Sequence, residues 1–86
     1  MTPLLDPRLL RAFAAIADAG SFTLAADRLS MTQSTISQQL ARLEEAVGQV
    51  LIDRAARPIQ PTAAGGRLLG YARRILALQE EAASAR

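Results

Sequence analysis

Residues Ala25–Gly48 read AADRLSMTQSTISQQLARLEEAVG, a pattern that predicts a short helix, a tight turn and a second, longer helix. The second helix is expected to begin at Thr32 and to end at Gly48, because Thr caps helix starts and Gly terminates helices. At about 100° per residue, one stripe of this helix is wholly apolar: Ile36, Leu40, Leu43 and Val47. Such a stripe is typical of a helix face buried against a core.

The opposite stripe of the same helix carries short, uncharged side chains, namely Ser34, Ser37, Gln38 and Ala41. A face that needed only solvation would usually carry charged residues, as this helix does later at Arg42, Glu44 and Glu45. Small amides and hydroxyls at a helix start suit a DNA major groove, because they can bond base edges without clashing. This face is therefore expected to read DNA bases.

The spacing of Ala26, Ser30 and Ile36 is that of a helix-turn-helix. A small residue at Ala26 lets two helices cross closely, and Ser30 lies at a turn that favours positive φ. Ile36 follows ten residues after Ala26 and is expected to anchor the second helix in the core. An ordinary αα-hairpin in a helical bundle would give the same apolar stripe, and it is the alternative on this motif alone.

The helix-turn-helix stretch is part of a longer series of segments. In chain order these are LRAFAAIADAGSFTLAADRLSMTQSTISQQLARLEEAVG, a short strand with Arg54, RPI, PTAAG and YARRIL. From Leu10 to Leu76 their order and spacing resemble the N-terminal DNA-binding domain of LysR-type transcriptional regulators. The resemblance implies an all-α fold with a small β-hairpin wing, that is, a winged helix-turn-helix followed by a long C-terminal linker helix. It assigns residues 1–61 to the winged helix-turn-helix and 62–86 to the linker helix. A larger effector-binding domain, the only expected route to a small-molecule effector, is absent from this chain.

The resemblance also assigns roles in the wing. In the family, an Arg before Pro-Ile or Pro-Val is positioned for the DNA minor groove, and Arg57 matches that place. Narrow A·T-rich minor grooves attract Arg because they concentrate negative potential. Three residues depart from the family pattern. Ile52 and Pro61 stand where Phe and Leu are common, and Gln38 stands where many members carry Arg, so guanine readout is not carried over to that position.

Composition limits the other possible functions. Eighty-six residues make one small domain, and eighteen Ala with three aromatic residues favour helix. The sequence has no Cys and no His, which excludes disulfides, the usual zinc sites and imidazole catalysis. Glu44 and Glu45 are neighbours on a helix and point about 100° apart, so they cannot share a substrate atom and are expected to be a structural, solvated pair. We expect no enzyme activity, no metal and no cofactor.

All ten basic residues are Arg, although the net charge is only +2. Seven of them lie between Arg28 and Arg74, with three acidic residues in the same stretch. Genomic base composition accounts for the choice of Arg over Lys, but not for this clustering. Arg binds phosphate through a planar fork that Lys lacks. No signal peptide and no apolar run long enough for a membrane are visible, which predicts a soluble cytoplasmic protein. As a bacterial DNA-binding regulator, it is expected at the nucleoid.

The flanking elements have clear boundaries. Asp6-Pro7 should open a first helix that ends at Gly20, and Ser21 should cap the second. Residues 50–52 are expected to form a strand, and residues 55–61 a loop with a return strand. Thr62 should cap a last helix that runs to about Ala83, although a frayed end beyond Glu80 is an alternative.

The last helix has apolar residues on more than one side, which requires a second partner. We expect Leu68, Tyr71, Ala72 and Ile75 to face the domain. The outward residues would then be Leu69, Leu76 and Leu78. The resemblance implies that they form a homodimer with the linker helices antiparallel, and the full-length protein could also form a tetramer.

Double-stranded DNA is thus the expected partner. Thr32 and Arg42 lie where a phosphate can dock, and the predicted base-reading residues are Gln33, Ser34, Thr35, Ser37 and Gln38. The wing adds Arg57, together with Arg54, for which a structural ion pair with Asp53 or the first helix is an equal alternative. A competing function is a protein–protein interaction module whose polar helix face binds a peptide.

Overall fold

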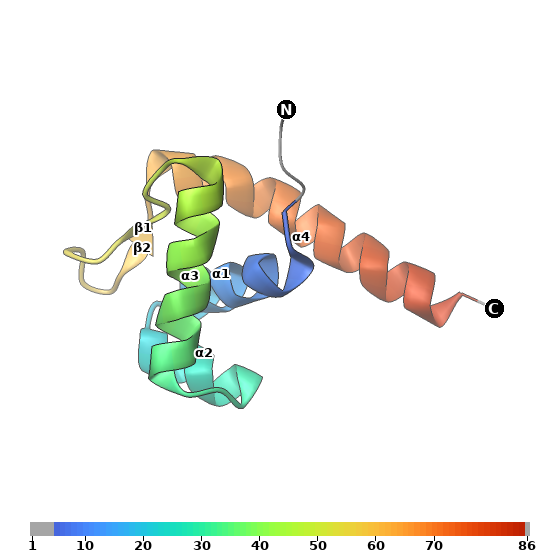
Figure 1. Ribbon diagram of the computed structural model, residues 1–86, viewed down its shortest axis with the longest axis horizontal. Helices are drawn as coiled ribbons and strands as arrows, with labels where there is room; N and C mark the ends of the chain where they lie inside the picture. Colours follow the sequence, from blue (N-terminus) through green and yellow to red (C-terminus); the bar gives the residue numbers. More distant parts are fainter. Residues whose placement is uncertain (1–4, 86) are drawn as a thin grey trace.

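The computed structural model describes residues 5–85, which form four helices and one two-stranded hairpin (Figure 1). The helices are α1 (Pro7–Ala19), α2 (Phe22–Leu29), α3 (Gln33–Val47) and α4 (Ala63–Ser84). Strands β1 (Ile52–Asp53) and β2 (Gln60–Pro61) lie between α3 and α4 and pair antiparallel. Residues 1–4, at the start of the predicted segment 1–61, and residue 86, at the end of the predicted segment 62–86, lie outside the described part. The predicted winged helix-turn-helix with a long last helix is confirmed.

Each helix begins at its predicted cap. The side chains of Asp6, Ser21, Thr32 and Thr62 each accept a hydrogen bond from a backbone N–H of the first turn. The side-chain hydrogen bond from Arg8, followed by the bond from its backbone N–H, holds the pKa of Asp6 below its ordinary value. The predicted positive φ angles are present at the helix ends: Gly20 at 66°, Ser30 at 55° and Gly48 at 71°.

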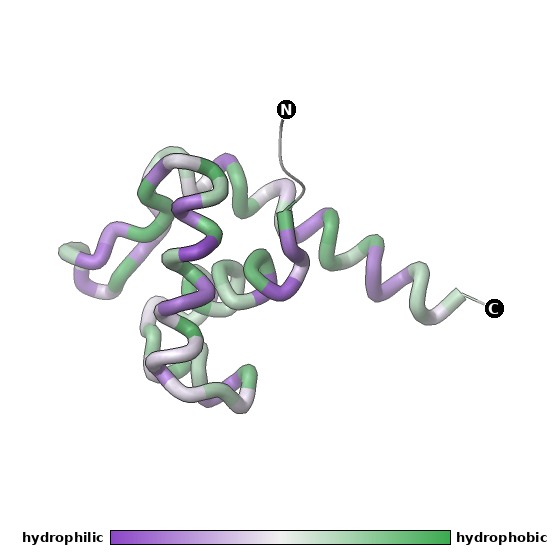
Figure 2. The backbone as a smooth tube through the Cα atoms, in the orientation of Figure 1, coloured by the Kyte–Doolittle hydropathy of each residue, from purple (hydrophilic) through white to green (hydrophobic). Residues whose placement is uncertain are grey.

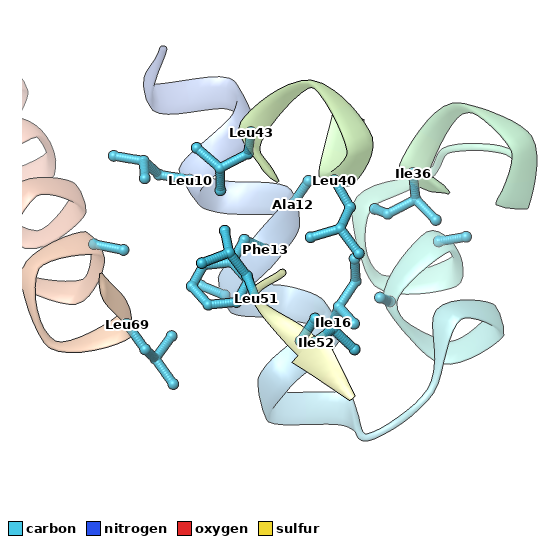
Figure 3. Close-up of a cluster of buried hydrophobic side chains, with 14 residues drawn as sticks. Leu10, Ala12, Phe13, Ile16, Ile36, Leu40, Leu43, Leu51, Ile52 and Leu69 are labelled. Carbon is cyan, nitrogen blue, oxygen red and sulfur yellow. The ribbon is translucent and has the colours of Figure 1, made fainter. Parts of the chain in front are cut away.

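The core lies where α1, α3, the start of the hairpin and the first half of α4 meet (Figure 3). Phe13 of α1 is its largest fully buried side chain. The predicted stripe of α3 supplies Ile36, Leu40 and Leu43, all fully buried, and Val47 packs partly against them. Burial of this stripe fixes the rotation of α3, so the polar stripe faces away from the core.

The turn between α2 and α3 confirms the helix-turn-helix. Ala26 is buried, as its small size predicted. Its carbonyl oxygen accepts a hydrogen bond from the N–H of Met31 at 2.9 Å, and the N–H of Ser30 donates to the carbonyl of Asp27 at 3.2 Å. These bonds close the turn within two residues of the α2 end, and α3 then begins at once.

The first strand lies further along the chain than predicted. Pairing begins at Ile52, opposite Pro61, and Val50 and Leu51 precede β1. The carbonyl of Leu51 accepts a backbone bond from the N–H of Thr62, but the N–H of Leu51 and the carbonyl of Val50 are bonded by side chains. The N–H of Leu51 donates to Oε2 of Glu44 at 2.8 Å, and Oγ1 of Thr62 donates to the carbonyl of Val50 at 2.7 Å. Glu44, predicted to be a solvated carboxylate, therefore ties the end of α3 to the hairpin.

The predicted orientation of α4 is wrong for several residues. Leu69 was expected on the outward face but is only 9% exposed and belongs to the core. Leu76 packs partly against the core. By contrast, Tyr71 and Ile75, expected to face inward, are exposed, Tyr71 to 59%. Leu78 is 62% exposed, as predicted.

Gly65 explains this rotation of α4. A Cβ atom built on Gly65 would lie 2.0 Å from the carbonyl oxygen of Leu51, so the helix can approach the chain this closely only at a glycine. Leu69 and Ala72 follow four and seven residues later on the same stripe and are buried with it. The more hydrophobic stripe, which contains Tyr71, is left facing outward.

The second half of α4 leaves the domain. It projects away from the other helices (Figure 1), and every described residue after Leu76 is exposed. Apolar and polar residues alternate along this projecting part (Figure 2). None of the helices between residues 5 and 85 combines the length and apolar character that crossing a membrane requires.

Candidate nucleic-acid interface

The polar stripe of α3 forms one exposed face. Gln33, Ser34, Thr35, Gln38 and Arg42 are exposed on it, whereas Ser37 is half-buried. The face is uncharged over its first two turns and becomes basic only at Arg42. Because the opposite stripe is buried in the core, this face keeps a fixed orientation relative to the domain.

The start of α3 combines a cap with unpaired backbone amides. Oγ1 of Thr32 accepts a hydrogen bond from the N–H of Thr35 at 3.1 Å and donates to Oγ1 of Thr35 at 2.9 Å. The Thr32 hydroxyl is thus used within the helix, while the Thr35 hydroxyl keeps its own proton for a further bond. The positive end of the helix dipole at this point favours an anion such as phosphate.

One contact at this site was missed at the sequence level. Nε2 of Gln33 donates to Oγ1 of Thr23, in the first turn of α2, at 2.6 Å. Thr23 precedes Gln33 by ten residues, the same interval that separates Ala26 from Ile36. Applying the helix-turn-helix spacing one turn earlier would therefore have paired these two residues. The contact holds the first side chain of α3 against α2.

The wing carries two exposed Arg residues on the segment between β1 and β2. Nη1 of Arg57 donates to the carbonyl oxygens of Arg54 at 2.8 Å and of Ala56 at 3.1 Å. Pro58 lies against Gly20 at the end of α1, with its Cβ 3.3 Å from the place that a Gly20 side chain would begin. The part of the wing next to β2 therefore rests on the corner between α1 and α2.

Arg54 makes neither of the ion pairs proposed for it. Its guanidinium carbon lies 4.7 Å from the centroid of the Phe22 ring, at the start of α2. Within residues 5–85 the two ion pairs are Arg8–Asp6 and Arg73–Asp18. The Arg residues of α3 and the wing consequently keep their charges free of carboxylate partners in the described part of the chain.

The predicted site residues are linked through the first turn of α2. Phe22 contacts Arg54 of the wing, and the next residue, Thr23, bonds Gln33 of α3. The two elements expected to touch DNA are therefore fastened to neighbouring residues. Among residues 5–85, no three acidic side chains gather in a way that could hold a metal ion.

Comparison with known proteins agrees with this geometry. Residues 7–66 match the family model described as "Bacterial regulatory helix-turn-helix protein, lysR family". The HTH-type transcriptional regulator PecT of Dickeya dadantii is 46% identical over 78 residues, which cover 91% of this chain and 25% of PecT. The chain spans about a quarter of the length of the curated relatives that it matches.

Two solved structures have nearly the same extent as this chain. The BenM DNA-binding domain in complex with benA site 1 DNA has a TM-score of 0.88 at 36% identity, covering 93% of this chain and 90% of that chain. The CbnR DNA-binding domain in its DNA complex has a TM-score of 0.85 at 42% identity, covering 92% and 91%. The chain therefore belongs to the lysR family of bacterial regulatory helix-turn-helix proteins, which are transcriptional regulators and not enzymes.

Proposed function

We propose that this chain binds double-stranded DNA at specific sequences, as the DNA-binding segment of a longer bacterial transcriptional regulator. The observation that carries the proposal is the exposed, uncharged hydrogen-bonding face of α3, held rigidly by the buried stripe of Ile36, Leu40 and Leu43. The similar BenM and CbnR domains were solved with DNA, which supports the same partner here. Binding to the chromosome would place the protein at the bacterial nucleoid.

In this proposal, α3 enters the major groove and the wing reaches the adjacent minor groove. The base-reading residues are Gln33, Ser34, Thr35, Ser37 and Gln38. Arg42 and the free amides at the α3 start, next to Thr32, bind phosphates and fix the register. Arg57, whose Nη1 bonds the carbonyl oxygens of Arg54 and Ala56 in the free protein, enters the minor groove. Exposure favours Gln38 and Ser34 over the half-buried Ser37 as the main readers.

Gln38→Ala should weaken binding to the preferred site by about 1–3 kcal/mol and relax base preference at one position. Binding to random duplex should change little, because Gln38 carries no charge for phosphates. Preferred sites are first obtained by selection from a random pool, and both affinities are then measured by fluorescence anisotropy. Gln49→Ala is the matched control, since it makes the same change at an exposed position beyond the end of α3. Equal losses on preferred and random duplex would show that this face does not read bases.

A second copy of the chain is the proposed partner of α4. A second stripe of α4 has alternating spacings of four and three residues, the repeat of a coiled-coil seam: Ala64, Leu68, Tyr71, Ile75, Leu78 and Ala82. Its first two residues are half-buried against the core, as expected for Leu68, and the other four are exposed. This seam lies about 110° around the helix from the buried stripe that contains Leu69. Of the residues first assigned to the dimer, only Leu78 lies on the seam, whereas Leu69 and Leu76 both lie on the buried stripe and pack against the core.

An antiparallel pair of α4 helices gives the dimer two-fold symmetry. One α3 helix reads too few base pairs to define a unique genomic site, so two copies on one face of the duplex are needed. The binding site should therefore be an interrupted inverted repeat, with its half-sites an integral number of helical turns apart.

Leu78→Glu should give a folded monomer, because it places a charge on the exposed part of the seam without touching the core. Mass is measured by light scattering, and affinity on full and half sites. Ala77→Glu is the control, because it adds the same charge on the far side of α4, about 140° from the seam, and should leave the dimer intact. A wild-type chain that stays monomeric at high concentration, and binds half sites as tightly as full sites, would exclude α4 as the dimer element.

A further inference from the structure

The strands of the hairpin are too short to hold the wing in place by their pairing alone. Each strand has two residues, and they pair only as Ile52–Pro61 and Asp53–Gln60. An isolated two-stranded hairpin is marginally stable in water. The segment between the strands, residues 54–59, must therefore be held by contacts with the rest of the domain.

Ile59 packs partly against the core, and two further contacts join the segment to the α1–α2 corner. The guanidinium of Arg54 lies over the Phe22 ring at 4.7 Å. Pro58 rests on Gly20, within 3.3 Å of the position of a Cβ there. Gly20 and Phe22 form the corner between α1 and α2, so the wing is fastened to that corner on both sides of Arg57.

Arg54 also connects directly to Arg57. The carbonyl oxygen of Arg54 accepts a hydrogen bond from Nη1 of Arg57 at 2.8 Å. The chain of contacts thus runs from the Phe22 ring to the Arg54 guanidinium, along the Arg54 backbone, and on to the Arg57 guanidinium. A planar, delocalised and weakly hydrated guanidinium is suited to stacking on an aromatic face.

We propose that Arg54 is a positioning residue for the wing: its stacking on Phe22 fixes the backbone that aims Arg57 at the minor groove. Arg54 then acts on DNA through Arg57 and does not bind a phosphate. This inference rests on the proposed minor-groove role of Arg57. The sequence predicted either a DNA contact or a structural ion pair for Arg54. The contact with the Phe22 ring is a third role that was not predicted.

The first test uses the free protein and no DNA. Backbone order parameters of Ala55, Ala56 and Arg57 are measured by nitrogen-15 relaxation in wild type, Arg54→Ala and Phe22→Leu. If the stacking holds the wing, both substitutions should lower these values from about 0.85 toward 0.6 or less, with helix content unchanged by circular dichroism. Unchanged order in both variants would overturn the inference.

The second test measures binding to one preferred site with either A·T-rich or G·C-rich flanks. Arg57→Ala should abolish the preference for A·T-rich flanks. Arg54→Ala and Phe22→Leu should each reduce that preference about two- to fivefold, the range expected from loss of an exposed cation–π contact. In the Arg57→Ala background, Arg54→Ala should add nothing further. Because Leu keeps the apolar bulk of Phe22 but not its ring face, the variant separates stacking from core packing.

The dependence on salt separates positioning from phosphate binding. Arg54→Ala should leave the slope of log affinity against log salt unchanged, whereas Arg42→Ala, a proposed phosphate contact, should lower its magnitude by about 1 on either flank. A slope lowered by about 1 in Arg54→Ala, or additive losses in the double variant, would overturn the inference. If wild type shows no flank preference, the minor-groove role of Arg57 itself fails, and the order parameters alone decide whether Arg54 holds the wing.

Discussion

Gly65→Ala should destabilise the domain by about 1–3 kcal/mol or more, the range for forcing extra atoms into a packed site. The new Cβ would lie 2.0 Å from the carbonyl oxygen and 2.9 Å from the carbonyl carbon of Leu51. Both are backbone atoms, so neither can rotate away, and α4 must shift off the hairpin. In a domain of this size, each kcal/mol lowers the midpoint of thermal unfolding by about 4–8 °C.

The same helix offers two matched controls. A Cβ on Gly66 or Gly70 would meet nothing within 4 Å, so alanine at either position should stabilise the helix by up to about 1 kcal/mol. The substitution of Gly by Ala should therefore lower the free energy of unfolding at position 65 and raise it at position 66. The free energy of unfolding is measured by urea and thermal denaturation, followed by circular dichroism. Gly65→Ala as stable as wild type would show that α4 is not packed as closely as described.

Affinity for double-stranded DNA should fall steeply as salt is raised. If a dimer neutralises about six phosphates, three from each copy, its affinity should fall about 10³-fold between 50 and 200 mM salt. The physical reason is the release of counterions from contacted phosphates. Arg42 and Arg57 are suited to such contacts, because both are exposed and form no ion pair within residues 5–85.

The salt dependence is measured by titrating random duplex and the preferred site at several salt concentrations. The random duplex should show the same steep fall, since phosphate contacts do not depend on sequence. A flat response on both duplexes would argue against DNA binding and would favour the competing peptide-binding module.

The sequence was most informative where a local rule applies. The caps at Asp6, Ser21, Thr32 and Thr62 were correct, because capping depends only on the next three residues of the chain. The buried stripe of α3 was correct as well, because its apolar and polar residues separate cleanly around the helix. The positive φ of Ser30 followed from its place in the turn.

The sequence was misleading where two solutions satisfy the same rule. Helix α4 has two apolar stripes with helical spacing, and hydrophobicity favoured the one with Tyr71 and Ile75. The buried stripe is instead the one that begins at Gly65. Helix α4 can approach the backbone of Leu51 closely only at a residue without a side chain, and an apolar side chain does not meet that requirement. The contact of Arg54 with Phe22 was also out of reach, since it depends on how the hairpin folds back onto the α1–α2 corner.

The attachment of the wing and of Gln33 to the adjacent residues Phe22 and Thr23 has a consequence for the choice of DNA site. Adjacent Cα atoms are about 3.8 Å apart, so the separation between the two anchoring points is fixed by a single peptide unit. In a complex of the proposed kind, these two anchoring points cannot move apart to follow a change in groove width. The duplex must supply the adjustment, and sequences that resist deformation lose affinity even at base pairs that no side chain touches. In such a complex, the stiffness of the flanking DNA becomes part of what this small domain recognises.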